Sequence, residues 1–178
     1  MATNLQPSLL RLSGLHFLYV GALAAQIIVY DAWQLLAPAA VLQRWTATAL
    51  LLGAVTGIWY RARPGQTAQA YRRLAFLLIL ADIGIATFGV YTQRGMASRA
   101  VALYAVPLVV ATILRSRAAL FTTAILCVAS YFVAAIAYFV LHFNEGYKIE
   151  LYGETGFYAA TFLLLAGLLA VTIRPTKA

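Results

Sequence analysis

The segment Arg73–Val90 reads RLAFLLILADIGIATFGV, and Asp82 is its only charged residue after Arg73. A helix needs about 20 mostly apolar residues to cross the hydrocarbon core of a bilayer. Five other stretches have a similar composition: roughly Leu12–Tyr30, Val41–Tyr60, Ala100–Leu114, Ala118–Leu141 and Gly156–Ile173. We therefore predict an all-α integral membrane protein. It would be a compact bundle of six transmembrane helices forming one domain over residues 1–178, with no soluble domain.

The overall composition supports the membrane class. Of the 178 residues, 63% are hydrophobic and 10% are charged, and the mean hydropathy is +0.85. A soluble domain carries about 25% charged residues, so this chain lacks the polar groups to cover a water-facing surface. A disordered chain and a nucleic-acid module are excluded for the same reason. One cysteine, Cys127, excludes an internal disulfide framework and a multi-cysteine zinc site.

The basic residues predict the orientation of the six spans. Nine of the 13 Lys and Arg fall on one side, in the N-terminal segment, the second and fourth loops and the C-terminus. These nine are Arg11, Arg61, Arg63, Arg72, Arg73, Arg115, Arg117, Arg174 and Lys177. The positive-inside rule then places both termini in the cytoplasm and the protein in the inner (cytoplasmic) membrane. The net charge of +8 thus predicts contact with anionic lipid headgroups and requires no nucleic-acid partner.

Asp82 is the strongest candidate for a functional side chain. It lies nine residues from both Arg73 and Tyr91, which places it near the middle of the bilayer. A carboxylate at that depth is costly, so we expect it to face the bundle interior with a partner or to be protonated. Binding of a cationic ligand, proton transfer and a structural hydrogen bond between helices all remain open. The candidate partners for such a hydrogen bond are Tyr104, Tyr131, Ser130 and Thr48.

Other polar side chains are expected near the outer surface. Arg44 either pairs with Asp31 or extends to the headgroups, and a polar loop containing His142 and Glu145 either binds a small polar ligand or is merely solvated. Within that loop, apolar and polar residues alternate from Tyr147 to Tyr152, so an extended cap and an irregular loop are both compatible with the pattern.

Small residues and one proline suggest how the helices pack. Ala49, Gly53 and Gly57 recur once per turn on one face of the second span, where close backbone approach is possible. Packing within the bundle is the favoured interpretation, and homodimerisation is the alternative. Pro107 would interrupt the hydrogen bonding of the fourth span and kink it, with or without a functional reason.

Enzyme signatures are largely missing from the sequence. The two histidines, His16 and His142, are expected at opposite membrane faces and cannot share a metal. No GxSxG, HExxH, P-loop or GxGxxG motif occurs. The sequence therefore favours a non-enzymatic function without a cofactor or metal.

The stretch Ser98–Ala137 resembles the membrane sensor modules of bacterial histidine kinases. The shared features are Leu103-Tyr104-Ala105-Val106-Pro107, a basic turn at Arg115-Ser116-Arg117 and a long Ala-rich helix carrying Tyr131. This resemblance covers about a fifth of the chain and implies a sensory module. Only Arg-Pro-Thr-Lys-Ala follows Ile173, so we expect such a module to act through a partner membrane or signalling protein.

Two functional hypotheses follow. The first is a sensory or accessory membrane module that binds a small apolar or amphiphilic ligand around Asp82, Tyr104 and Tyr131. The second is small-solute transport, because the size and six-span topology also resemble the substrate-binding subunits of energy-coupling-factor transporters. A structural, lipid-interacting protein without a ligand is a third alternative.

Overall fold

The computed structural model describes residues 5–93, 95, 98–142 and 148–173. Within these ranges the chain is helical and contains no strand. The described residues form six helices, and five of the six predicted spans correspond to helices long and apolar enough to cross a membrane. A single compact bundle uniting all six helices stays a prediction, because the chain divides into two compact units, Met1–Ala81 and Asp82–Ala178.

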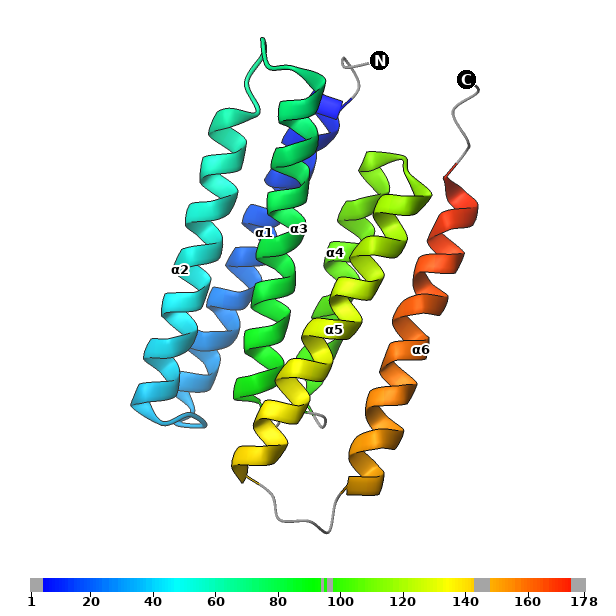
Figure 1. The fold of residues 1–178 in the computed structure, drawn as a ribbon. Helices are drawn as coiled ribbons and strands as arrows, with labels where there is room; N and C mark the ends of the chain where they lie inside the picture. The colour runs from blue at the N-terminus through cyan, green and yellow to red at the C-terminus, as the bar shows by residue number, and fades with distance from the viewer. Residues whose placement is uncertain (1–4, 94, 96–97, 143–147, 174–178) are drawn as a thin grey trace. The chain divides into compact units, whose positions relative to one another are not determined.

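The first unit contains α1 (Leu5–Ala32), α2 (Pro38–Arg61) and the first part of α3 (Ala68–Thr92). α1 and α2 form an antiparallel hairpin (Figure 1). Gln34 ends α1 in the left-handed conformation, with φ 52°. The N–H of Gln34 donates to the carbonyl of Asp31, and the N–H of Leu35 donates to the carbonyl of Tyr30, both at 2.9 Å. This pair of hydrogen bonds is a Schellman motif. Pro38 then starts α2, at a position where its missing N–H has no cost.

The second unit contains the rest of α3, a segment of mixed helix type, α5 (Arg117–His142) and α6 (Lys148–Thr172). The mixed segment consists of the 3₁₀ helix η3 (Arg99–Tyr104), α4 (Ala105–Ala111) and the 3₁₀ helix η4 (Thr112–Leu114). α4 packs against both α5 and α6, and α5 and α6 are antiparallel neighbours (Figure 1).

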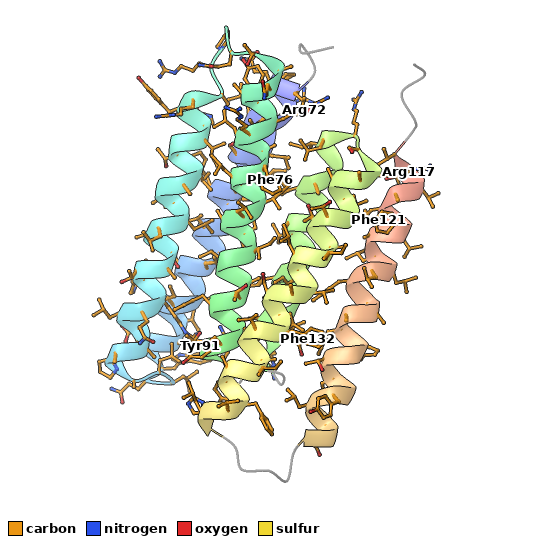
Figure 2. The ribbon with its side chains drawn as sticks, in the orientation of Figure 1. Arg72, Phe76, Tyr91, Arg117, Phe121 and Phe132 are labelled. Carbon is orange, nitrogen blue, oxygen red and sulfur yellow. The ribbon has the colours of Figure 1, made fainter. Side chains whose placement is uncertain are left out.

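The mixed segment occupies the position of the predicted fourth span, Ala100–Leu114. Pro107 is the third residue of α4, close enough to the start of the α-helix for its missing N–H to be tolerated. The segment ends at Arg115, which is left-handed with φ 48°, and Ser116 then caps α5 by accepting a hydrogen bond from the N–H of Ala119 at 3.3 Å. Figure 2 shows Arg117 and Phe121 at this end of α5 and Phe132 farther along it.

The extended cap considered for the outer loop is wrong for residues 148–152. α6 begins at Lys148, eight residues before the expected start of the span at Gly156. Leu151 and Thr155 are buried one turn apart, and the Thr155 hydroxyl donates to the Leu151 carbonyl. Helical packing of this pair therefore overrides the two-residue alternation. Residues 143–147, including Glu145, lie outside the described part of the chain.

The small-residue face of α2 does not pack within the first unit. Ala49, Gly53 and Gly57 are all exposed. A Cβ added at Gly53 or Gly57 would meet no heavy atom within 4 Å. Packing through this face, in the bundle or in a homodimer, therefore stays a prediction.

Candidate functional site

Asp82 and Thr87 place one buried and one half-buried polar group on α3. Asp82 is 1% exposed. Thr87 lies five residues later, and its hydroxyl donates to the carbonyl of Ile83 at 2.7 Å, the usual bond of a helical threonine to the preceding turn. The same oxygen lies 2.9 Å from the Tyr104 hydroxyl. Because the single Thr87 proton is used on Ile83, Tyr104 must be the donor in this contact.

A close approach of α3 and η3 brings Tyr104 to Thr87. Gly89 makes the approach possible, because a Cβ at this position would lie 2.8 Å from the Cβ of Ala100. Ser98 fixes the start of η3: its hydroxyl oxygen accepts from the N–H of Ala100 at 3.0 Å and donates to the Gly89 carbonyl at 3.4 Å. Tyr104 ends η3 and is fully buried.

Tyr131 of α5 joins Tyr104 in a buried aromatic cluster. The cluster comprises the buried Tyr104, Tyr131 and Phe162 and the half-buried Tyr158. Ring centroids of Tyr131 lie 6.2 Å from Tyr104, 5.4 Å from Tyr158 and 6.1 Å from Phe162, with the rings nearly edge to face in each case. Phe162 also lies 5.2 Å from Tyr104. These separations are typical of favourable aromatic pairs, so three segments of the second unit are held together at this point.

The hydroxyl of Tyr131 differs from that of Tyr104. Tyr131 is 0% exposed, and its hydroxyl oxygen has no hydrogen-bond partner among the described residues. A buried polar group without a partner costs about 1–3 kcal/mol, and native structures contain few of them. The two fully buried phenols of the cluster therefore differ: Tyr104 has a hydrogen-bond partner, and Tyr131 has none among the described residues.

Cys127 completes the surroundings one turn before Tyr131. Its thiol is fully buried and lies 4.0 Å from the carbonyl oxygen of Tyr104, at the limit of a weak hydrogen bond. Among the described residues, no group of three or more His, Cys, Asp and Glu could hold a metal.

The structure thus brings together Tyr104 and Tyr131 of the predicted site, and Asp82 lies in the same unit. Arg44 belongs to the other unit, where its guanidinium lies 5.6 Å from the ring centroid of Tyr30 and forms no ion pair with Asp31. His142 is exposed at the end of α5, stacked on Tyr138 at 4.2 Å. Glu145 lies outside the described residues.

Four residues of this site were missed by the sequence analysis: Thr87, Cys127, Tyr158 and Phe162. A signal for three of them was available, because Cys127 precedes Tyr131 by four residues and Tyr158 precedes Phe162 by four. Residues four apart share a helix face, so each pair predicts a common direction. Thr87 carries no such signal, since its partner Tyr104 lies on another element.

Comparison with protein-family models, curated proteins and solved structures finds no match to this chain. The chemistry of the cluster is therefore the guide to function. Aromatic faces favour an apolar or amphiphilic molecule, and the Tyr131 hydroxyl can donate one hydrogen bond and accept another.

Proposed function

We propose that the protein crosses the cytoplasmic membrane six times with both termini in the cytoplasm. Five helices have the required length and composition. The remaining span, the segment of mixed helix type from Arg99 to Leu114, has 16 residues, and nine of them are in 3₁₀ helices. A 3₁₀ helix rises about 2.0 Å per residue against 1.5 Å in an α-helix, so the segment extends about 28 Å, close to the ~30 Å of the hydrocarbon core.

Cysteine labelling tests this topology. Ala37→Cys and Gln66→Cys introduce a thiol at exposed positions in successive loops, and Cys127→Ala removes the native one. In intact cells, a membrane-impermeant maleimide should label the variant at position 37. It should label the variant at position 66 only after permeabilisation. The reverse pattern would refute the proposed orientation.

Within the membrane, the protein acts as a sensory or accessory module that binds a small amphiphilic ligand in the second unit. The observation that carries this proposal is the buried Tyr131 hydroxyl, which has no partner among the residues the structure describes and lies next to aromatic rings and the hydrogen-bonded Tyr104–Thr87 pair. The apolar part of the ligand would contact Phe162 and the tyrosine rings. Its polar group would bond to the Tyr131 hydroxyl, and a partner membrane or signalling protein would receive the response.

Native mass spectrometry of the full chain, extracted in mild detergent, tests the ligand directly. We expect a bound small molecule in the wild-type protein and its loss in Tyr131→Phe, which removes only the hydroxyl. Tyr104→Phe is the matched control, because it removes a hydroxyl whose bond goes to Thr87, and it should retain the molecule. Absence of a bound molecule from wild-type protein, or equal retention by Tyr131→Phe, would refute the proposal.

The same preparation distinguishes sensing from transport. If the bound molecule accumulates in vesicles only when this chain and an energised partner are present, the energy-coupling-factor hypothesis replaces the sensory one. Absence of flux, together with co-purification of a signalling protein, would support the sensory module.

A further inference from the structure

The loop between α2 and α3 is held in place by several contacts that converge on Arg63. Its guanidinium lies 4.2 Å from the ring centroid of Tyr60, a cation–π distance. Its carbonyl accepts a 2.8 Å hydrogen bond from the hydroxyl of Tyr71, which is 3% exposed. Thus both the backbone and the side chain of Arg63 have a fixed neighbour.

The rest of the loop is equally well defined. Gly65 has φ +98°, a backbone conformation that residues with a side chain rarely adopt, and it turns the chain after Pro64. Thr67 caps α3, because its hydroxyl oxygen accepts from the N–H of Ala70 at 3.2 Å. The loop is therefore a built turn that presents its side chains in a defined arrangement.

Four arginines flank this turn, and all are exposed. Arg61 and Arg63 precede Gly65, whereas Arg72 and Arg73 lie in the first turns of α3, where Figure 2 shows Arg72. The sequence has no Asp or Glu between Asp31 and Asp82, and none of these four arginines has an ion pair within the described ranges. Their charge is therefore available to an external anion.

Trp59 and Tyr60 indicate where that anion lies. They immediately precede Arg61, and they are 46% and 59% exposed. Exposed Trp and Tyr at the end of an apolar helix are typical of the headgroup level of a bilayer. A lipid headgroup fits this position better than a soluble polyanion or a nucleic acid.

We propose that the Arg61–Arg73 turn is a specific site for an anionic lipid with two phosphates. One arginine pair stands on each side of the turn, and a guanidinium binds phosphate oxygens through paired N–H donors. This inference rests on the proposed topology, which places the loop at the cytoplasmic leaflet. It goes beyond general attraction to anionic lipid because it requires the fixed geometry of the turn.

The test is binding of cardiolipin, which has two phosphates, and of phosphatidylglycerol, which has one, to the full chain in detergent micelles by native mass spectrometry. At equal phosphate concentration, cardiolipin should bind the wild-type protein more tightly. The double variant Arg61→Gln/Arg63→Gln should weaken cardiolipin binding roughly 10- to 30-fold, from about 1 kcal/mol per basic residue. The matched control Arg115→Gln/Arg117→Gln removes the same charge from another basic turn and should leave binding within about twofold.

Tyr71→Phe separates a built site from simple charge attraction. It removes the hydrogen bond to the Arg63 carbonyl without changing the charge of the chain. We expect several-fold weaker binding of cardiolipin and unchanged binding of phosphatidylglycerol. Arg61→Lys/Arg63→Lys, which keeps charge but loses the planar fork, should also weaken cardiolipin binding.

Two results would overturn the proposal: equal loss of binding in the two Gln double variants, or unchanged cardiolipin binding in both Tyr71→Phe and the Lys variant. Circular dichroism must show wild-type helix content in every variant compared. Failure of the topology alone would be recognised separately, because micelle binding does not depend on orientation whereas the labelling at positions 37 and 66 does.

Discussion

The two central tyrosines should respond in opposite directions when each hydroxyl is removed. Tyr131→Phe takes away a fully buried hydroxyl that has no partner among the described residues. It should therefore raise the free energy of unfolding of the ligand-free protein by about 1–3 kcal/mol. Tyr104→Phe removes the 2.9 Å bond to Thr87 and should lower it by about 0.5–1.5 kcal/mol.

These differences are large enough to measure by thermal unfolding of the delipidated protein in detergent. For a chain of this length, 1 kcal/mol corresponds to roughly 2–4 °C in Tm. Tyr131→Phe should then unfold about 2–12 °C higher than wild type and Tyr104→Phe about 1–6 °C lower. The ring contacts are retained in both variants, so the aromatic packing cancels in the comparison.

The sign of the Tyr131→Phe change is the critical result. A Tm equal to that of wild type or lower would mean that the hydroxyl is satisfied in the folded protein. The reasoning that links it to a ligand would then fail. Thr87→Val provides a second check on the Tyr104 bond, because it leaves the buried Tyr104 hydroxyl without this partner and should cost about 1–3 kcal/mol alone. Adding Tyr104→Phe should recover part of that loss, since both partners are then apolar.

Three further predictions concern the contacts that position the site, and all use the same thermal assay. Gly89→Ala should lower the free energy of unfolding by about 1–2 kcal/mol, because the added Cβ would lie 2.8 Å from the Cβ of Ala100. The control Gly84→Ala, whose Cβ would meet no heavy atom within 4 Å, should be neutral or stabilising. Equal Tm values for these two variants would contradict the prediction. Gly95→Ala should be at least as costly as Gly89→Ala, because Gly95 has φ +59° and an added Cβ would lie 2.7 Å from the ring of Tyr138. A Tm within about 1–2 °C of wild type, roughly the error of the measurement, would refute this prediction. Ser98→Ala should lower stability by about 1 kcal/mol through loss of the η3 cap, and Ser98→Thr should restore most of it.

Hydropathy located the apolar part of each helix but not its ends. α6 begins eight residues earlier than expected because Leu151 and Thr155 pack in a polar stretch that an average over about 20 residues treats as loop. The irregular fourth segment shows the same limit. Pro107 lies inside the short α-helix α4, so the kink predicted there stays a prediction. The 3₁₀ winding of residues 99–104 depends instead on the capping serine and on the close contact at Gly89.

The candidate site was predictable one side chain at a time but not as an assembly. Asp82 is conspicuous as a charged residue in an apolar stretch. Tyr104 and Tyr131 are conspicuous as large polar side chains expected inside predicted spans. Which of these groups is satisfied depends on a neighbour in another helix, as with Thr87 and Tyr104. Sequence spacing describes one helix face at a time, so it contains no information on that pairing.

The lipid site and the ligand cluster also differ in how their energies arise, and this makes them separable. The arginines are exposed, so their attraction for phosphate is screened by salt and should weaken as ionic strength rises. The Tyr131 hydroxyl is buried among aromatic rings, and a bond to it should be almost independent of salt. Raising the salt concentration should therefore release cardiolipin while the small molecule stays bound. Tyr131→Phe should release the small molecule while cardiolipin stays bound.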